Sequence, residues 1–419
     1  MAHPAQSLPN LKRETAPWLF AESTQAVFEA LAARGFKARA VGGSVRNALI
    51  GKAVSDIDIA TDGLPEAVMA ACEAKSLKVA PTGLKHGTVT VVSGAVPFEV
   101  TTLRRDVETD GRHAVVAFTD DWHADAARRD FTINALYADQ DGTIFDPLGE
   151  GARDLAQRRV RFIGDADARI REDYLRILRF FRFSAEYASG DFDRDGLAAI
   201  ARNVDGLDRL SVERIWSEAK KIMLAPRAVD AVDAMIGTGI LVRIFGAVPQ
   251  PRVFARRLAL DDAMQRASAR DPMSRLGALL VLTDGDSLRL AERLKLSWDE
   301  HDGLRALIAT PPIAKDLALR DARKALHRLR SDYRMRLLHD WALSGDHVDD
   351  PAWRALYGVP ETHPVPPFPL SGKDLLAAGL KPGPDVGAML RALEDWWIDA
   401  DYPDRAAVLA EFKRRTATP

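Results

Sequence analysis

The sequence predicts an α+β protein, in which an N-terminal head with a mixed sheet and helices precedes an all-α remainder. Before about residue 150, short runs of alternating or β-branched residues are separated by helical segments. After that point nearly every segment has helical periodicity, and strand patterns are scarce. With 419 residues, 47% of them hydrophobic, the chain can form several domains with buried cores.

Strands are expected in the head wherever β-like runs lie between turn residues. The segment DQDGTIFDP (139–147) is expected to form a hairpin turn and a return strand. The other expected strands are 37–41, 56–61, 77–82, 87–94, 96–103 and 131–139.

The helical remainder is interrupted by Pro and Gly residues, which indicate breaks between its parts. The stretch VPETHPVPPFPLSG (359–372) is linker-like. We therefore expect four domains: head 1–150, helical neck 151–225, helical body 226–310 and helical tail 311–419.

The composition indicates in which cellular compartment the protein resides. No run of about 18 apolar residues is present, so no transmembrane helix is expected. The N-terminus lacks the apolar core of a signal peptide. The single cysteine, Cys72, allows no internal disulfide, and its helical surroundings predict a small buried hydrophobe. These features predict a cytoplasmic protein.

The segment VSDIDIATDG (54–63) contains two aspartates separated by one residue. In a strand, Asp56 and Asp58 would lie on one face while Ile57 and Ile59 enter a core. A solvated strand edge would explain such a pair in isolation. Two adjacent carboxylates that repel each other are also a natural ligand set for a divalent cation.

A glycine-rich turn precedes this strand in VGGSVRNALIG (41–51). Gly42, Gly43 and Ser44 lead into a helix, whose first backbone N–H groups can bind an anion. Arg46 adds a positive charge in the first turn. A phosphate cradle beside paired carboxylates points to Mg²⁺, which binds carboxylates together with substrate phosphates.

A third carboxylate is expected from VPFEVTTLR (96–104). In a strand, Phe98 and Val100 would share one face, and Glu99 and Thr101 the other. If this strand neighbours the aspartate strand, Glu99 joins the same face, which suits two-metal phosphoryl transfer. Without that neighbouring strand, Glu99 would be an ordinary charged residue paired across the sheet.

Charge is unevenly distributed although the formal net charge is −2. Residues 1–150 contain 15 basic and 20 acidic residues, so the acidic excess lies where metals are expected. Basic residues dominate 151–187, with nine arginines against six acids, and 320–336, with seven Lys or Arg against two Asp. A polyanion could lie along these two clusters, and a solvated helix face is the alternative for each.

Four motifs carry a resemblance to a known family. VGGSVRNALIGKAVSDIDIAT, HGTVTVVSGAVPFEVTTLR, RRDFTINALYAD and REDYLRILRFFRFSAEY resemble the class II tRNA nucleotidyltransferases and bacterial poly(A) polymerases of the DNA polymerase β superfamily. The resemblance is close over about 45–190 and looser beyond. It implies a polymerase-β-like head with neck, body and tail, metal ligation by Asp56 and Asp58, and Glu99 as the third catalytic carboxylate. Asn47 departs from the aspartate that the family often has there.

The motif ARRDFTINA (127–135) groups Arg128, Arg129, Asp130 and Asn134 around an expected strand start. Arginine suits triphosphate oxygens, and a carboxylate or amide suits ribose hydroxyls. By resemblance the motif binds the sugar and phosphates of a ribonucleotide. An Arg–Asp salt bridge without a ligand is the alternative.

The segment REDYLRILRFFRF (171–183) predicts one helix. Asp173 and Arg176 lie three residues apart, which would ordinarily indicate an intrahelical salt bridge. By resemblance this pair reads the incoming base, Glu172 anchors Arg176, and Arg179 joins the nucleotide-binding set. The expected apolar stripe of the helix is Tyr174, Leu178, Phe181 and Ala185.

The base-reading logic follows from hydrogen bonding. Cytosine and adenine each present an amino donor beside a ring-nitrogen acceptor, which an aspartate and an arginine complement. Guanine and uracil present the reverse order and would leave buried polar groups unpaired. The protein would therefore select C and A without a nucleic-acid template.

Other segments give weaker signals. The charged stretch 104–125 is expected to be a mobile surface loop, with His113 as a loop residue, and by resemblance it helps to switch between C and A addition. His86 is expected to bond at a strand start. Ser211 is the expected N-cap of an RNA-binding helix. In 375–397 a Gly/Pro turn is expected to join two helices. By resemblance this segment contacts tRNA, and the alternative is a simple helical hairpin. Trp396 and Trp397 are expected to be packing residues.

The resemblance implies template-independent addition of CCA to tRNA 3′ ends from CTP and ATP, with Mg²⁺ and release of pyrophosphate. Poly(A) polymerase and CC-only or A-only addition are the alternatives. The near-neutral charge and the ending EFKRRTATP, without a long basic extension, favour CCA addition. A catalytically inactive RNA-binding protein is disfavoured, because the expected catalytic and base-reading residues are present. No membrane partner is expected, and the oligomeric state is open.

Overall fold

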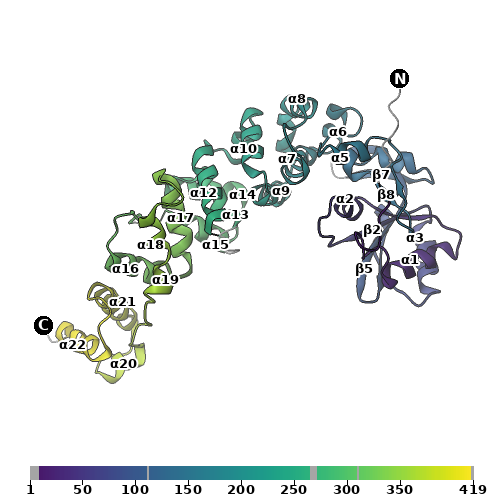
Figure 1. The fold of residues 1–419 in the computed structure, drawn as a ribbon. Helices are drawn as coiled ribbons and strands as arrows, with labels where there is room; N and C mark the ends of the chain where they lie inside the picture. The colour runs from purple at the N-terminus through teal and green to yellow at the C-terminus, as the bar shows by residue number, and fades with distance from the viewer. Residues whose placement is uncertain (1–8, 111–112, 265–270, 309–310, 417–419) are drawn as a thin grey trace. The chain divides into compact units, whose positions relative to one another are not determined.

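The computed structural model describes residues 9–110, 113–264, 271–308 and 311–416 (Figure 1). The chain forms two compact units, Met1–Gly246 and Ala247–Pro419. The first contains the sheet and the helices that follow it, and the second is helical over its described residues. The predicted α+β architecture is confirmed, whereas the boundaries between the four expected domains stay predictions.

A seven-stranded mixed sheet forms the head, in the order β3-β4-β5-β2-β1-β8-β9. β2 and β5 run parallel, and the other neighbours are antiparallel. The predicted return strand is confirmed as β9. The strands are β1 (Ala38–Val41), β2 (Ile57–Thr61), β3 (Lys78–Gly83), β4 (Thr88–Ser93), β5 (Val96–Thr102), β8 (Tyr137–Ala138) and β9 (Ile144–Phe145).

Two helices, α1 (Glu22–Ala32) and α3 (Pro65–Glu73), cover one face of this sheet (Figure 1). Alternate residues of β4 and β5 are buried, which is the period that a half-covered strand requires. Cys72 is buried in α3, as predicted. On the opposite face, β2 and β5 present Asp58, Glu99 and Thr101 beside the buried Ala60.

Two predicted segments differ from the structure. The strand expected over 131–139 is only β8, because Thr132–Asn134 form the 3₁₀ turn η2. The expected loop 104–125 contains an antiparallel pair, β6 (Arg104–Asp110) with β7 (His113–Phe118), and then α4 (Trp122–Ala127). The β-branched residues in HAVVAF favour this pairing despite the charged neighbours.

Roles were also predicted for two histidines, His86 and His113. His86 lies in the 3₁₀ turn η1 (Leu84–His86), and its carbonyl oxygen accepts a hydrogen bond from Arg104. The side chain of His113 lies outside the described part of the molecule.

The predicted helix over 171–183 is broken. α6 (Ala166–Glu172) ends just before Asp173, which is extended with φ −152° and ψ 107°, and α7 (Leu175–Tyr187) begins at Leu175. The break occurs because the Asp173 carboxylate accepts the backbone N–H of Leu175 at 3.1 Å, in competition with the helix. Tyr174 therefore lies outside the helix, while the rest of the predicted stripe, Leu178, Phe181 and Ala185, is buried in α7.

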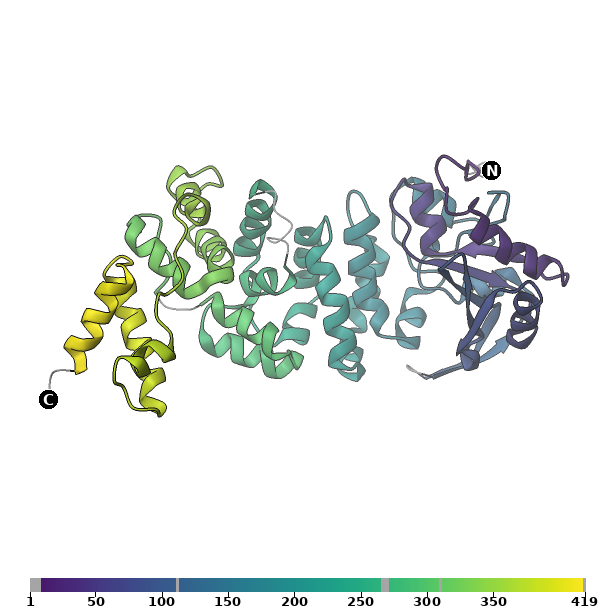
Figure 2. The same cartoon turned by 90° about the horizontal axis from the view of Figure 1, so that it is seen from below.

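The remaining helices of the first unit pack on one another, with α7 against both α9 and α10. Figure 2 shows this stack, in teal, as helices lying side by side. Ser211 is the N-cap residue of α9, although its side chain makes no cap bond. The helices are α2 (Gly43–Leu49), α5 (Gly151–Ala156), α6 (Ala166–Glu172), α7 (Leu175–Tyr187), α8 (Arg194–Arg202), η3 (Val204–Arg209), α9 (Val212–Leu224), α10 (Ala228–Gly237) and α11 (Ile240–Phe245).

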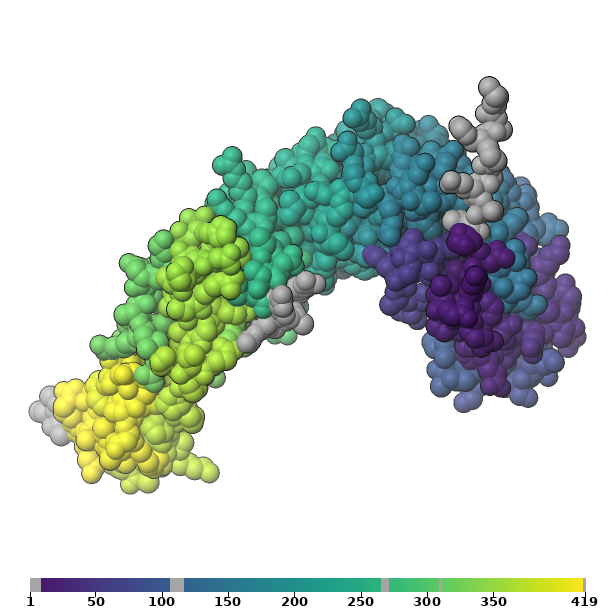
Figure 3. All heavy atoms as spheres, in the orientation of Figure 1, coloured from purple at the N-terminus to yellow at the C-terminus, as the bar shows by residue number. Residues whose placement is uncertain are grey.

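The second unit has separate apolar clusters. One surrounds Trp341 and Trp353, whose rings stack at 5.8 Å. The other joins the last three helices, the yellow end of the chain in Figure 3, around Trp397 and Phe412. The predicted helical hairpin is confirmed as α20 and α21, and Trp396 packs against the second cluster.

The helices of the second unit are α12 (Pro251–Met264), α13 (Pro272–Leu280), α14 (Asp284–Leu294), α15 (Trp298–Ala306), α16 (Leu319–Leu329), η5 (Arg330–Asp332), α17 (Tyr333–Ser344), α18 (Pro351–Tyr357), α19 (Val359–Thr362), α20 (Gly372–Ala377), α21 (Pro384–Asp399) and α22 (Arg405–Thr416). Over the residues described, none of the helices has the length and apolarity needed to cross a membrane.

We expect Gly142→Ala to destabilise the head more than Gly149→Ala does. Both glycines have a positive φ, +89° and +69°, which costs an alanine about 1–2 kcal/mol. A Cβ at Gly142 would also lie 2.1 Å from the carbonyl oxygen of Leu11, whereas one at Gly149 meets nothing within 4 Å. Thermal unfolding measures the difference, and equal losses of Tm would contradict a rigid Leu11 contact.

Candidate active site

Three carboxylates gather on the open face of the sheet. β2 and β5 pair in parallel with Asp58 opposite Glu99, and Asp56 directly precedes β2. Ile57 and Ile59 are buried on the other face, as the alternation predicts. The pKa of Asp58 is raised to about 6, first by burial and then by the nearby charges of Glu99 and Asp56, against the opposing effect of Arg129. The site therefore favours a cation.

The glycine turn lies against two arginines. Gly42 has φ +74°, and a Cβ there would lie 3.6 Å from Nη1 of Arg129. A Cβ on Gly43 would lie 3.7 Å from Nη2 of Arg46. Both distances are ordinary van der Waals contacts, so it is the positive φ of Gly42 that favours glycine in this turn.

Arg46 is buried rather than free at the surface. It donates to the Asn134 amide oxygen and, at 2.7 Å, to the hydroxyl of Tyr187, whose ring it also covers at 4.0 Å. Burial lowers the pKa of its guanidinium. Arg46 thus ties the glycine turn to α7 as well as bringing charge.

Asn47 has a structural role in this turn. Its amide oxygen accepts from Arg46 Nε at 3.2 Å and Nη2 at 2.9 Å, and its amide nitrogen donates to the Ala53 carbonyl at 3.0 Å. An amide fits here because it can accept and donate at once.

Arg128 and Arg129 are held by a carboxylate that the sequence patterns did not reveal, Asp125. It accepts from Arg128 at 2.6 Å, from Arg129 at 3.1 Å and from the Tyr137 hydroxyl at 2.7 Å. Burial alone would raise its pKa, but Arg129 and Arg128 lower it to about 2. Asp125 therefore stays ionised and fixes both arginines.

Asp130 is the partner of Arg179. Its carboxylate accepts from Arg179 Nε at 2.8 Å, from the Asn134 amide at 2.9 Å and from the Phe131 N–H at 2.8 Å. Although burial opposes ionisation, Arg179 and these donors lower the pKa of Asp130. The Arg–Asp pair considered within 127–135 is replaced by two others: Asp130 pairs with Arg179 of α7, and Arg128 and Arg129 pair with Asp125.

The proposed base-reading pair is not an intrahelical salt bridge. Asp173 accepts from Arg214 Nη2 at 2.8 Å, and Arg214 comes from α9. Arg176 pairs instead with Glu172, as predicted, and donates to the Arg169 carbonyl at 2.8 Å. Asp173 and Arg176 therefore have separate supports, and both line one cavity.

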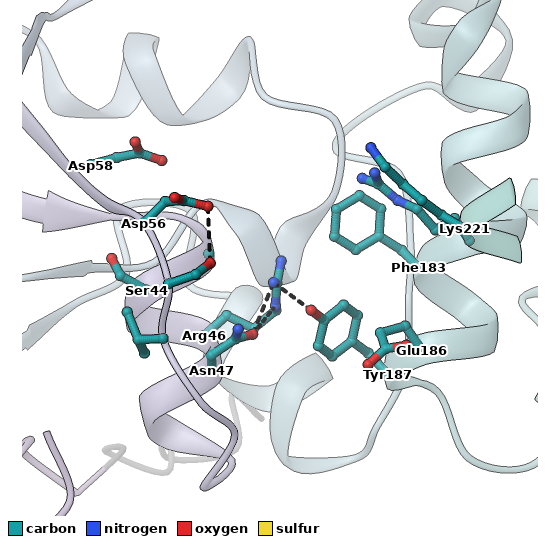
Figure 4. Close-up of a pocket in the computed structure, with 13 residues that line it drawn as sticks. Ser44, Arg46, Asn47, Asp56, Asp58, Phe183, Glu186, Tyr187 and Lys221 are labelled. Atoms are coloured by element: carbon teal, nitrogen blue, oxygen red, sulfur yellow. Dashed lines mark hydrogen bonds between the residues drawn. The ribbon is translucent and has the colours of Figure 1, made fainter. Parts of the chain in front are cut away.

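Two adjoining cavities bring the predicted residues together, and both are lined by Gly43, Arg46, Asp58 and Phe183. The first, of about 400 Å³, adds Ser44 and Asp56. Figure 4 shows Asp56 and Asp58 on one side of it and Phe183, Tyr187 and Lys221 on the other. Glu99 lines neither cavity.

The second cavity, of about 490 Å³, gathers the remaining predicted nucleotide-binding residues. Arginines dominate its polar lining. The predicted residues along it are Gly42, Gly43, Arg46, Asp58, Arg128, Arg129, Asp130, Asn134, Asp173, Arg176 and Arg179.

The carboxylates fit Mg²⁺ only with help from a substrate. Among the described residues, no group of three or more His, Cys, Asp and Glu side chains is arranged to hold a metal ion. Mg²⁺ commonly takes one or two protein carboxylates and completes its shell with water and phosphate oxygens. Asp56 and Asp58 meet that requirement, because both line the first cavity and Asp58 also lines the second.

Several residues of the site were missed by the sequence patterns. Arg182, Tyr187 and Lys221 line the first cavity, and Arg214 lines the second. They come from α7 and α9, far from the glycine and aspartate motifs in the chain. The arginine-rich composition of 151–187 was the available signal for Arg182.

Known proteins resemble this chain over most of its length. A family model described as "Poly A polymerase head domain" matches residues 38–161, and one described as "Probable RNA and SrmB-binding site of polymerase A" matches 191–251. The mitochondrial CCA tRNA nucleotidyltransferase 1 of Mus musculus is 34% identical, covering 95% of this chain and 91% of the mouse protein. The CCA-adding enzyme of Leuconostoc citreum is 32% identical, covering 96% and 98%.

Solved structures agree with this likeness. The Bacillus stearothermophilus CCA-adding enzyme in complex with CTP has a TM-score of 0.75 at 28% identity, covering 95% of this chain and 98% of that one. The Thermotoga maritima CCA-adding enzyme complexed with tRNA has a TM-score of 0.68 at 18% identity, covering 98% and 100%, and shares the fold.

The head fold and these similarities define the class of protein, a nucleotidyltransferase, and the chain is therefore an enzyme. Two relatives at 34% and 32% identity cover nearly all of it. The chain belongs to the CCA tRNA nucleotidyltransferase family.

We expect Asp58→Asn to raise Tm at pH 7.5 without metal, by about 2–4 °C for roughly 1 kcal/mol. The folded protein holds the Asp58 proton up to a pKa of about 6, whereas the unfolded chain releases it near pH 4. Ionised Asp58 thus lowers the free energy of unfolding as pH rises through this window. The gain should vanish near pH 4, and Mg²⁺ should stabilise only the wild type.

Asp141 provides a control of opposite sign. The Thr143 N–H lowers the pKa of Asp141, so its ionised form stabilises the fold above about pH 4. Asp141→Asn should therefore lower Tm at pH 7.5. A Tm of Asp58→Asn below that of the wild type at this pH would contradict the proposed carboxylate repulsion.

Proposed function

We propose that this enzyme adds C, C and A to tRNA 3′ ends from CTP and ATP, without a nucleic-acid template, and releases pyrophosphate. The observation that carries the proposal is the lining of the second cavity, where triphosphate-binding arginines and the Asp173–Arg176 pair lie beside Asp58. Relatives named as CCA-adding enzymes support the choice of reaction.

We assign the nucleotide-binding roles to groups that are already oriented. Arg128 and Arg129, fixed by Asp125, suit phosphate oxygens. Asp130 and Asn134 suit the ribose hydroxyls, and their mutual hydrogen bond of 2.9 Å fixes both. Preorganised donors lose little freedom when the nucleotide binds.

Asp56 and Asp58 are the proposed Mg²⁺ ligands, with Glu99 as a supporting carboxylate. Bound Mg²⁺ supplies a Lewis acid that lowers the pKa of the attacking hydroxyl and neutralises the leaving pyrophosphate. Asp56→Ala or Asp58→Ala should abolish incorporation without unfolding the protein, and Glu99→Ala should cost less. Near wild-type turnover of Asp58→Ala at saturating Mg²⁺ would contradict this role.

Poly(A) polymerase is the second candidate, because the head model that matches residues 38–161 is named for that activity. CC-only and A-only addition also share the catalytic groups. The deciding experiment offers a tRNA transcript lacking CCA with each labelled NTP and with mixtures. CCA addition predicts two C and one A and then a stop, whereas a growing run of A would support the second candidate.

The proposal extends to the rest of the chain. The helical neck and tail are proposed to bind tRNA, as the family resemblance implies. A cytoplasmic location stays a prediction, and relatives include proteins named as mitochondrial.

We expect Asp173→Ala to weaken the preference for CTP and ATP over UTP and GTP about ten- to a hundredfold. Each lost contact to a charged group is worth roughly 1.5–3 kcal/mol. Competition kinetics with all four NTPs measure the ratio. Because Arg214 loses its partner in this variant, Arg214→Ala is the control: it should affect overall rate more than the ratio.

Arg176→Ala should impair C and A addition alike, because one pair serves both bases. If Asp173→Ala and Arg176→Ala lost rate but kept the wild-type ratio of C and A over U and G, the two residues would be structural and base selection would lie elsewhere.

A further inference from the structure

Arg39 of β1 lies on the face of the sheet that carries the carboxylates, but it lines neither of the two cavities. Val41 pairs with Asp58 on one side and with Tyr137 on the other. Arg39 is two residues earlier in the same strand, so its side chain projects from the same face as these three. A charged residue at this place is next to the site without being part of its surface.

Two aromatic rings enclose the Arg39 guanidinium. Its central carbon lies 4.4 Å from the ring centroid of Trp122 and 4.1 Å from that of Phe145. Nε donates to the Asp139 carboxylate at 2.9 Å, which fixes the plane of the group. A planar guanidinium that stacks on both rings holds Trp122 in one orientation.

Trp122 is the first residue of α4, and Asp125 follows three residues later on the same face of that helix. A helix of six residues is marginal by itself and depends on tertiary packing. Trp122 supplies such packing, edge-on against Tyr137 at 5.4 Å and against Phe145 at 6.4 Å between ring centroids. These contacts hold α4 on the sheet and thereby decide where Asp125 lies.

Tyr137 connects the aromatic cluster to the arginines of the second cavity. Its ring packs against Trp122, and its hydroxyl donates to Asp125 at 2.7 Å. The same hydroxyl accepts from Nε of Arg129 at 3.3 Å, while Nη2 of Arg129 donates to Asp125 at 3.1 Å. An unbroken series of contacts thus leads from Arg39 to Arg129.

We propose that Trp122, clamped by Arg39, is a positioning residue for nucleotide binding. It acts through Asp125, whose place on α4 sets the direction of Arg128 and Arg129. The proposal rests on the proposed function, in which these arginines bind the triphosphate, and adds to it a residue that lines neither cavity. Misdirected guanidinium groups would bind the nucleotide more weakly and leave the RNA surface as it was.

Trp122→Ala should raise KM for CTP and for ATP about tenfold, roughly the loss of one contact to a charged group. The Kd of CTP, measured by equilibrium dialysis with Mg²⁺ and without RNA, should rise by the same factor. The kcat at saturating nucleotide and the Kd of a tRNA transcript lacking CCA should change little.

Three further variants separate positioning from general destabilisation. Trp122→Phe keeps an aromatic ring against Arg39 and Tyr137 and should return the Kd of CTP close to that of the wild type. Arg39→Ala loosens the clamp without removing the Trp122 ring, so it should shift the Kd of CTP in the same direction by less. His123→Ala is the matched control, because His123 is the next residue of α4 and is exposed.

A double variant tests the route through Asp125. Asp125→Asn should itself raise the Kd of CTP, and adding Trp122→Ala should raise it little further, because both changes release the same arginines. If the two effects multiplied, Trp122 would act independently of Asp125 and the proposal would be wrong.

The proposal would also be wrong if Trp122→Ala lowered Tm and kcat but left the Kd of CTP unchanged, or weakened transcript and CTP binding alike. Failure of the wild type to incorporate C and A would instead refute the proposed function, since the Kd of CTP needs no turnover.

Discussion

Electrostatic repulsion between carboxylates on one face of the sheet is the constraint around which the first unit is organised. The parallel pairing of β2 with β5 puts Asp58 opposite Glu99, and the buried isoleucines on the other face hold it there. The fold cannot relieve the repulsion by turning a side chain inward, because that face is already packed. Relief must come from cations, and Arg129 is the one that most directly opposes the raised pKa of Asp58.

The cations on the neighbouring walls are themselves restrained. Asp125 fixes Arg128 and Arg129, Asp130 fixes Arg179, and Glu172 fixes Arg176. These ion pairs add little net stability, because the desolvation free energy of burying charged groups is about as large as the attraction between them. Their effect is orientation: a ligand meets guanidinium groups that already have a direction. Asp173 differs, because a base that bonds to it must share or displace Arg214.

The sequence patterns correctly predicted the features that depend on local periodicity. The alternation in DIDIAT and VPFEVTT predicted which side chains face the site, and the burial of Phe98 and Val100 agrees. Asp125, Arg214 and Lys221 were not found, because their positions depend on which helices pack together. The break at Asp173 was missed since a single carboxylate–amide bond decides it.

A formal net charge of −2 is compatible with binding a polyanion, because the two signs are segregated. In the first unit, acidic residues crowd where metal would neutralise them and arginines line the cavities. The basic cluster 320–336 is different: Arg323 pairs with Asp401, and Lys324 with Asp399, within the second unit. Charge counted along the sequence therefore overstates the field this cluster presents. By contrast, Arg182 of α7 and Lys221 of α9 share one carboxylate, Glu218, whose single charge balances only one of the two.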